Sequence, residues 1–398
     1  MVLLDTDMLI VHAWFNGQYV PAGKLRIIGR SAEFWYGDSF LSKGYALDPI
    51  RLPLTQQVFH ADGLQGDLGV LGDALPDGWG RYLIKRQFER GLSDLELLYV
   101  DSSKQRMGAL YFSKGLDDKP EDNVHTLDWM MQFSDWLNGS NPSFPDKMEY
   151  GSSVGGAKPK CLVNTSDTEW IVKFQRANEP DNTPAIERGT LLLAKACQIS
   201  VSDSRLIALP DAKTAILVKR FDRDNKQPLH YISAQTLCNV LMNDRGQALN
   251  DTRSYLVLAD ALSKFSSQAR CDRLDLFKRI VFNILVNNHD DHVKNHGALR
   301  SIKGDWALSP AFDLVAGEGS SRDLAMEIGP EGYRATLDNL MHSVSTFGLT
   351  KKQGVDEVMK MLKTIKKWKL IFSDAGVDDK TINDIAWAIQ DDIDVSGL

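Results

Sequence analysis

Residues 283–295 gather carboxylates, imidazoles, amides and an amine in one short stretch. Within it, Asp290 and Asn295 are separated by four residues. A carboxylate can accept the proton of an attacking hydroxyl, and an amide oxygen can bind Mg²⁺ beside phosphate groups. A second carboxylate, Asp313, follows among apolar residues, where it must be hydrogen-bonded, cap a backbone end or bind a cation. The three side chains together predict magnesium-dependent phosphoryl transfer.

Other interpretations of the same residues remain open at this point. Asp and Asn favour turns and helix caps, so residues 288–295 could be a solvated capping loop, and Asp313 could also be a cap. The run His289, Asp290, Asp291, His292 could instead be a metal site. Adjacent side chains cannot all point at one ion, however, and no further His/Cys cluster completes the ligand set.

A loop of small residues at 151–160 could cover phosphates. It matches neither G-x-x-x-x-G-K-[ST] nor the G-x-G-x-x-G pattern. Ser152 and Ser153 nevertheless stand beside backbone amides that could form an anion-binding nest, with Lys158 and Lys160 alongside. The alternative is an ordinary hairpin turn.

Two further segments carry residues suited to nucleotide binding. Lys173 lies in the alternating run 170–174, where a strand lysine could bind phosphates, and Glu187 on the next helix could be its partner. Residues 219–223 close an apolar strand at the junction between the strand-rich and helical parts, where backbone groups could bind adenine. A solvent-facing lysine and a charged strand exit are the simpler interpretations.

The hydrophobic pattern changes from strand-like to helical along the chain. Residues 276–285 place apolar side chains at i, i+3, i+4, i+7 and i+8, which predicts a buried helix leading into the Asp290 loop. Residues after 232 are expected to be almost entirely helical. The other expected elements are strands at 9–15, 24–28, 160–164, 169–174 and 215–218, and helices near 80–90 and 185–198.

This order of elements predicts an α+β, bilobal, protein-kinase-like fold. It has a strand-rich N-terminal part with an extra N-terminal subdomain and a mostly α-helical C-terminal lobe. Turn-rich stretches at 113–123 and 138–143 favour boundaries. We expect domains at 1–120, 121–222 and 223–398.

Composition and sequence pattern argue against a disulfide-rich protein, a membrane-spanning protein and a protein with a general attraction to nucleic acid. The chain has 398 residues, of which 43% are hydrophobic and 25% charged, as in globular proteins. Its four cysteines are scattered, its start does not resemble a signal peptide, and no apolar run is long enough for a bilayer. These features favour a cytoplasmic protein. The net charge of −7 gives no general attraction to nucleic acid.

Residues 351–369 carry seven lysines on a predicted helix. A charged outer face of this kind is usually solvated, and local nucleic-acid contact is the alternative. The expected inner stripe comprises Val355, Val358, Met359, Leu362 and Ile365.

Together these motifs resemble the HipA family of bacterial serine/threonine kinases, the toxins of type II toxin–antitoxin systems. The similarity extends over nearly the whole chain. The motifs that carry it are 11–23, Leu-Pro-Asp-Gly-Trp-Gly-Arg at 75–81, 153–157, Lys-Arg-Phe-Asp-Arg at 219–223, 290–295 and Phe312–Asp313.

The resemblance implies ATP and Mg²⁺ as cofactors and gives the residues roles. Asp290 would accept the proton, with His292 and Lys294 near ATP or the transition-state charge, while Asn295 and Asp313 would bind the metal. Ser153, or Ser152 as second choice, would be autophosphorylated and so switch the kinase off. The implied ATP-binding residues are Ser153, Val154, Gly155, Gly156, Ala157, Lys158, Lys173, Lys219, Arg220, Phe221, His292, Asn295 and Asp313.

The resemblance also implies partners. The target would be an aminoacyl-tRNA synthetase, and a small helix-turn-helix antitoxin, similar to HipB, would neutralise the toxin and carry any operator contact. Membrane contact is not expected. Two departures, residues 230–235 in place of H-x-E-D and Lys158–Pro159 in the loop, leave the subfamily and target open. The alternatives are a small-molecule kinase of the same fold and a non-catalytic module that regulates an antitoxin–DNA complex.

Overall fold

The computed structural model describes residues 4–101, 106–120, 131–133, 158–165, 168–175, 182–209, 213–242, 247–318, 322–395 and 397–398. Contacts divide the chain into two units, each built from three stretches. Unit 1 comprises Met1–Lys173, Arg220–Asp251 and Leu299–Gly304, and unit 2 comprises Phe174–Lys219, Thr252–Ala298 and Asp305–Leu398. One boundary therefore falls between Lys219 and Arg220, within the predicted hinge. The division at 1–120, 121–222 and 223–398 stays a prediction.

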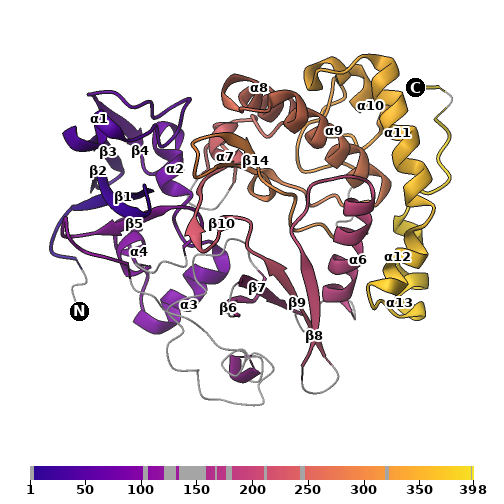
Figure 1. The fold of residues 1–398 in the computed structure, drawn as a ribbon, viewed down its shortest axis with the longest axis horizontal. Helices are drawn as coiled ribbons and strands as arrows, with labels where there is room; N and C mark the ends of the chain where they lie inside the picture. Colours follow the sequence, from indigo (N-terminus) through magenta and orange to yellow (C-terminus); the bar gives the residue numbers. More distant parts are fainter. Residues whose placement is uncertain are drawn as a thin grey trace. The chain divides into compact units, whose positions relative to one another are not determined.

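Unit 1 contains a five-stranded antiparallel sheet in the order β4-β3-β2-β1-β5 (Figure 1). Its strands are β1 (Met8–Phe15), β2 (Gln18–Ile28), β3 (Ser31–Tyr36), β4 (Val58–Asp62) and β5 (Leu110–Ser113). β1 is buried along most of its length, and it has a neighbouring strand on each side. In β3 burial alternates, so that Ala32, Phe34 and Tyr36 share one covered face.

Local sequence explains the first hairpin. Asn16 and Gly17 both have positive φ, +51° and +83°, as a two-residue type I′ turn requires. The register of β1 and β2 shifts between Val11 and His12, and Pro21 pairs at this irregularity. Proline cannot donate a ladder hydrogen bond, so a bulge is a position that tolerates it.

The rest of unit 1 consists of short helices and strand pairs. β6 and β7 form an antiparallel pair in which Lys160 is directly opposite Lys173. The structure gives these two strands the predicted bounds. The elements are α1 (Asp38–Lys43), η1 (Gly66–Leu68), α2 (Gly69–Gly72), α3 (Gly78–Phe88), α4 (Asp94–Val100), β6 (Lys160–Asn164), β7 (Glu169–Phe174, its last residue in unit 2), β10 (Arg223–Asp224), β11 (Gln227–Pro228), β12 (His230–Ser233) and α7 (Ala234–Leu237).

Unit 2 is mainly helical. Besides the helices it holds the antiparallel pair β8–β9 and the short strand β14. Its elements are α6 (Thr183–Ala196), β8 (Ser204–Ala208), β9 (Thr214–Lys219), α8 (Tyr255–Phe265), α9 (Ala269–Leu285), η4 (Val293–Asn295), β13 (Gly297–Arg300, its last two residues in unit 1), β14 (Trp306–Leu308), α10 (Leu337–His342), η5 (Val344–Phe347), α11 (Lys351–Ile365), α12 (Trp368–Asp374), α13 (Asp379–Asp384) and η6 (Ala386–Ala388).

α9 forms the core of unit 2. It packs against α8, α10, α11 and β14, while α6 packs against α12 (Figure 1). The predicted stripe on residues 276–285 is confirmed, since Phe277, Ile280 and Ile284 are all fully or almost fully buried. A helix buried this completely holds the loop at its C-terminal end in a defined place.

Two predictions differ from the structure. The region after residue 232 is not almost entirely helical, because β12, β13 and β14 interrupt it. Met359 does not belong to the inner stripe of α11: it is 41% exposed, whereas Met361 is 3% exposed. The buried residues of α11 are Gly354, Val358, Met361, Leu362 and Ile365, so the predicted positions Val358, Leu362 and Ile365 are confirmed, and Met361 faces the core in place of Met359. Within the described part of the chain, no helix has both the length and the apolar character needed to cross a bilayer.

Candidate functional site

The loop that carries Asp290 begins where α9 ends. The Asn288 amide donates to the Asn283 carbonyl at 3.0 Å, and Gln390 Nε2 donates to the Ile284 carbonyl at 3.0 Å. Asn287 has φ of +48°, a left-handed conformation that asparagine tolerates better than most residues. The chain therefore turns sharply out of the buried helix just before Asp290.

Asp290 and Asn295 come together through a short helical turn. The 3₁₀ helix η4 is closed by the Asn295 amide, which donates to the His292 carbonyl at 2.8 Å. Asn295 is buried, and its Nδ2 donates to the Asp290 carbonyl at 3.4 Å, whereas the Asp290 side chain is exposed. Among the described residues no hydrogen bond uses Asn295 Oδ1 or the Asp290 carboxylate. These oxygens are the atoms that a cation and a hydroxyl proton would need.

The neighbouring carboxylate, Asp291, is used in a different way. It is 1% exposed and accepts hydrogen bonds from the Tyr255 hydroxyl at 2.5 Å and from Asn283 Nδ2 at 2.5 Å. His296 Nε2 lies 2.8 Å from the same carboxylate oxygen, Oδ2. Burial opposes ionisation of Asp291, but attraction and hydrogen bonds from His296 and Tyr255 keep its pKa below the ordinary value. Asp291 thus anchors the loop to α8 and α9.

This arrangement is incompatible with the metal site considered on residues 289–292. Asp290 is exposed and Asp291 is buried in its own hydrogen-bond network, so the two carboxylates do not face one ion. Among the described residues no group of three His, Cys, Asp or Glu side chains could hold a metal. A magnesium site here would therefore use one carboxylate and an amide, with phosphate and water oxygens completing the shell.

The segment around Asp313 lies beside the Asp290 loop. The Ser309 amide donates to the Gly297 carbonyl at 2.8 Å, and the Gly317 amide donates to the Val286 carbonyl at 3.0 Å. The His289 amide donates to the Glu318 carbonyl at 2.8 Å. Residues 286–297 and 309–318 are therefore joined on both sides of the two candidate carboxylates.

Asp313 itself has an unusual backbone. Its φ is +59°, the left-handed conformation that non-glycine residues seldom adopt and that occurs preferentially at functional sites. The residues that follow are fixed, because the Ala316 amide donates to Thr190 Oγ1 of α6 at 3.1 Å. On the other side, the Ala311 amide donates to the Ser200 carbonyl at 2.7 Å. The fold therefore holds this residue from both directions.

The donor set fits a magnesium–nucleotide complex. Asn295 and Asp313 offer the hard oxygen ligands that Mg²⁺ prefers. His292 Nδ1 is buried and has no hydrogen-bond partner among the described residues, so a bound group could satisfy it. Lys294 is exposed on the same turn.

In unit 1 the predicted phosphate lysine is buried. Lys173 is 9% exposed, and Lys160 opposite it is 4% exposed. Directly opposed residues of an antiparallel pair share one face, so two positive side chains lie side by side. Glu187 is also buried, on α6. Lys158 is half-buried, while Ser152, Ser153, Val154, Gly155, Gly156 and Ala157 lie outside the described residues.

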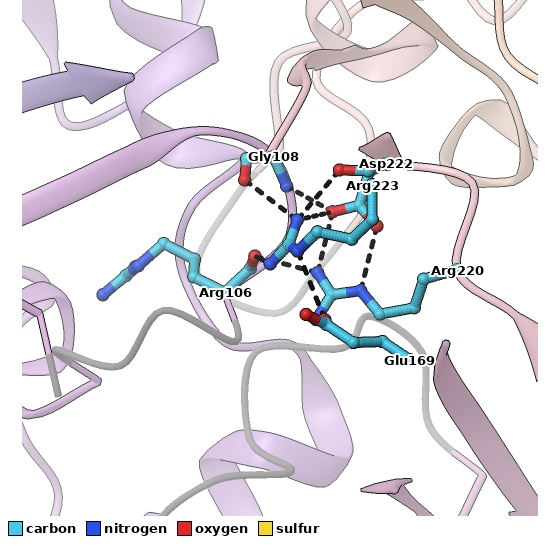
Figure 2. A network of polar contacts seen from close by, with 6 residues as sticks. All are labelled: Arg106, Gly108, Glu169, Arg220, Asp222 and Arg223. Atoms are coloured by element: carbon cyan, nitrogen blue, oxygen red, sulfur yellow. Dashed lines mark hydrogen bonds and ion pairs between the residues drawn. The ribbon is translucent and has the colours of Figure 1, made fainter. Parts of the chain in front are cut away.

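The predicted hinge at residues 219–223 is not a simple charged strand exit, because part of it is buried. Lys219 is exposed, but the side chains of Arg220 and Asp222 are each only 1% exposed and bind one another (Figure 2). The amides of Lys219 and Arg220 already donate to the carbonyls of Asp203 and Glu169. These two amides are therefore engaged within the protein.

Sequence reasoning missed the anchoring residues Tyr255, Asn283 and His296. The available signal was the doublet Asp290–Asp291. If one of two adjacent carboxylates takes part in the reaction, the other needs a different role, such as anchoring the loop. The distance of 36 residues between Tyr255 and Asp291 conceals that pairing in the sequence.

More than half of the chain matches a known protein family. The HipA-like C-terminal domain matches residues 152–368. The "Putative kinase" of Haemophilus influenzae is 24% identical over 225 residues, 51% of this chain and 65% of that protein. The "Putative kinase Y4dM" of Sinorhizobium fredii is 24% identical over 223 residues, 51% of this chain and 51% of that protein. The matched part of this chain thus spans about two thirds and one half of these relatives.

A solved structure shows the same fold. It is the HipA toxin–antitoxin system of Shewanella oneidensis MR-1, a complex of HipA, HipB and operator DNA. The TM-score is 0.70 at 18% identity, covering 96% of this chain and 94% of that one. The predicted α+β kinase-like class is confirmed. Because the matched domain spans more than half of the sequence, the chain belongs to the family of proteins with a HipA-like C-terminal domain.

Proposed function

We propose that this protein is a magnesium-dependent serine/threonine protein kinase that transfers the γ-phosphate of ATP to a serine of a protein target. The observation that carries the proposal is the pairing of two segments in unit 2. Backbone hydrogen bonds join residues 286–297 to residues 309–318, which brings the Asp290 loop beside the strained residue Asp313. Membership of the HipA-like family supports the same reaction.

Each residue of the site has a role in this reaction. The exposed Asp290 carboxylate accepts the proton of the target hydroxyl as the new oxygen–phosphorus bond forms, while the bond from the γ-phosphorus to the bridging oxygen breaks and ADP leaves. Asn295 and Asp313 would hold Mg²⁺, which supplies charge neutralisation at the phosphates when bound. Lys173, with the loop at 153–158, would bind the phosphates, and His292 and Lys294 would face the transferred group. Phe221, which follows Lys219 and Arg220 in the predicted hinge, would contribute the adenine contacts.

We also propose the biological setting of the HipA toxins for this chain. A small helix-turn-helix antitoxin, similar to HipB, would neutralise the kinase and carry the operator contact, as the HipA–HipB–DNA complex of the similar structure suggests. An aminoacyl-tRNA synthetase is the proposed target. Autophosphorylation of Ser153, or of Ser152, would add about 1.5–2 negative charges and repel the ATP phosphates. The support for the target and for autophosphorylation is the family resemblance.

Mass spectrometry after incubation with ATP and Mg²⁺ tests the proposal. Wild type should gain phosphate in the segment 151–158, and Asp290→Asn should not. Added aminoacyl-tRNA synthetases should be modified only by wild type. Absence of both ATP binding in calorimetry and phosphate transfer, in protein not already phosphorylated, would overturn the proposed function.

A further inference from the structure

Unit 1 contains a buried ionic network centred on Asp222 (Figure 2). Arg220 binds the Asp222 carboxylate with two nitrogens, Nε to Oδ1 at 2.9 Å and Nη2 to Oδ2 at 2.7 Å. Arg223 Nη1 binds Oδ2 of the same carboxylate at 2.8 Å. Glu169 accepts from both arginines, at 3.3 Å from Arg220 Nη1 and 3.2 Å from Arg223 Nε. Two positive and two negative side chains therefore balance one another.

Charge balance explains why the network can be buried. The side chains of Arg220, Asp222 and Arg223 are 1%, 1% and 6% exposed. Burial alone would raise the pKa of Asp222, but the two guanidinium groups overcome this effect and lower the pKa to about 2. Removing one member would leave an uncompensated charge away from water, which is costly.

The network also fixes a loop that is remote in sequence. The Gly108 amide donates to Asp222 Oδ2 at 2.8 Å, and the Arg106 carbonyl accepts from Arg220 and Arg223 at 3.0 and 2.9 Å. The guanidinium of Arg106 points away from the network (Figure 2) and donates to the carbonyls of Ala74, Leu98 and Asp101. Arg106 thus connects the network to a second set of backbone anchors.

Gly108 could not readily be another residue. Its φ is +77°, and an added Cβ would meet the Cβ of Tyr231 at 3.2 Å and the Tyr231 backbone amide nitrogen at 3.3 Å. The ring of Tyr231 is 6.2 Å from the ring of Phe221. The loop at 106–108 therefore supports the hinge both by hydrogen bonds and by close packing.

These contacts limit the backbone of Phe221, which lies between the anchored residues Arg220 and Asp222. On one side the Arg220 amide donates to the Glu169 carbonyl at 3.0 Å, and on the other the Asp222 carbonyl accepts from the Leu229 amide at 2.9 Å. The side chains of Arg220 and Asp222 are held in the same network. The backbone of Phe221 consequently has little freedom to rotate.

We infer that Asp222, Arg220, Arg223 and Glu169 are positioning residues that hold the Phe221 backbone in place for recognition of a purine base. The inference rests on the proposed function, because it concerns the same nucleotide. It adds a specificity determinant: these four side chains do not touch the nucleotide but fix the groups that distinguish adenine from guanine. Backbone donors and acceptors discriminate bases only when their directions are fixed.

Two variants of the full-length protein test the inference. Asp222→Asn keeps the shape of the side chain and removes its charge, and Glu169→Gln does the same at a more exposed member. Glu96→Gln is the matched control: Glu96 pairs with Arg90 and closes the capping box at the start of α4, also in unit 1, and it contacts none of the four network side chains. The measurements are KM and kcat for ATP and for GTP, with circular dichroism to confirm folding.

For Asp222→Asn we expect KM for ATP to rise about tenfold, the effect of roughly one lost hydrogen bond to a positioned group. The preference for ATP over GTP should fall by a similar factor, while kcat at saturating ATP stays within about twofold. Glu169→Gln should shift KM in the same direction by a smaller factor, and Glu96→Gln should shift neither quantity. If the network had only a structural role, KM and the base preference of all three variants would change in proportion to their loss of stability.

The outcomes separate the inference from the proposed function. If wild type transfers phosphate and both network variants keep its KM and its base preference, the inference is wrong and the proposed function stands. If wild type binds no nucleotide, both are wrong. Should Asp222→Asn fail to fold, Glu169→Gln alone decides, and a wild-type base preference in that variant would overturn the inference.

Discussion

Asp222 in unit 1 and Asp291 in unit 2 are equally buried, each 1% exposed, but they are held by different kinds of partner. Asp222 binds two guanidinium groups and one backbone amide. Asp291 binds a phenol, a carboxamide and an imidazole. Arginine keeps its charge at every relevant pH, whereas phenol and carboxamide donors are neutral.

The difference teaches what each network can do. Fixed charges at Asp222 make the site insensitive to moderate changes of pH, but each member depends on the others for charge balance. At Asp291 the neutral phenol and carboxamide orient the carboxylate, and the His296 imidazole is the partner whose charge attracts it. In both places a buried carboxylate adjoins the residue proposed to act on the nucleotide or target, Phe221 beside Asp222 and Asp290 beside Asp291.

The largest expected effect is on catalysis and not on folding. Asp290→Asn should lower phosphoryl transfer by about 10²–10⁴-fold, the usual contribution of a general base, because the amide cannot accept the proton. Its stability should stay within about 0.5 kcal/mol of wild type, since the side chain is exposed. Transfer assays and urea unfolding measure the two quantities.

Asp313→Asn serves as the companion to this variant. It should also abolish transfer, and the double variant should be little worse than either single one, because the two groups act in one site. Growth inhibition by Asp290→Asn equal to that of wild type, after expression in bacteria, would show that Asp290 is not the proton acceptor.

Asp222→Ala should cause the largest loss of stability. Two buried arginines would then share the single carboxylate of Glu169, and breaking a buried ion pair costs about 3–5 kcal/mol. Urea unfolding of the purified protein gives the free energy of unfolding. A loss of less than about 1 kcal/mol would mean that water reaches these guanidinium groups.

Asp291→Ala should destabilise less. It leaves Tyr255 and Asn283 without their acceptor, and unsatisfied neutral groups cost roughly 1–3 kcal/mol. Unlike Asp290→Asn, this variant should lose stability and transfer activity together, because the loop is no longer anchored. A stable, inactive Asp291→Ala protein would instead assign Asp291 a direct catalytic role.

These networks mark the limit of what the sequence could predict. The strands β6 and β7 and the buried face of α9 follow from patterns within a few residues, and both were predicted. Some partners of Asp222 and Asp291 are remote in sequence, such as Gly108, 114 residues from Asp222, and Tyr255, 36 residues from Asp291. No local pattern encodes such a pairing.

The wrong assignment of Met359 to the inner stripe of α11 shows a second limit. Met359 and Met361 are equally apolar, so composition alone does not fix which of them faces the core. The phase of the helix is decided by its packing against α9 and α6, which are distant in sequence. In the candidate site, the Asp290–Asn295 spacing is local and could be recognised in the sequence, whereas the segment of Asp313 is joined to the Asp290 loop only in the folded chain.

The loss of stability in acid should reveal the contribution of the Asp222 carboxylate directly. The pKa of Asp222 is lowered to about 2 from an ordinary value of 3.8, so the carboxylate stabilises the folded state above pH 4. This stabilisation is lost as the pH falls through 2, because the unfolded state then binds the proton first. It amounts to something on the order of 2 kcal/mol. The groups facing the carboxylate, Arg220 and Arg223, do not titrate in this range.

Unfolding measured in urea between pH 5 and pH 2 checks this prediction. Wild type should lose more stability over this range than Asp222→Asn, which has no carboxyl group to protonate. The comparison variant Glu96→Gln should keep the wild-type contribution of Asp222. Equal slopes for wild type and Asp222→Asn would contradict a lowered pKa at this residue.

The smallest effect is expected for Glu169→Gln, which tests whether the network depends on total charge or on the geometry at Asp222. Glu169 is 17% exposed and makes longer contacts, 3.3 and 3.2 Å, than Asp222 does. Its amide replacement keeps an oxygen that accepts from both arginines, and water can supply part of the lost solvation. We therefore expect a loss of about 1 kcal/mol in urea unfolding. A loss as large as that of Asp222→Ala would mean that charge balance alone holds the network together. In that case the two substitutions should be strongly non-additive, because the first would already have broken the balance that the second disturbs.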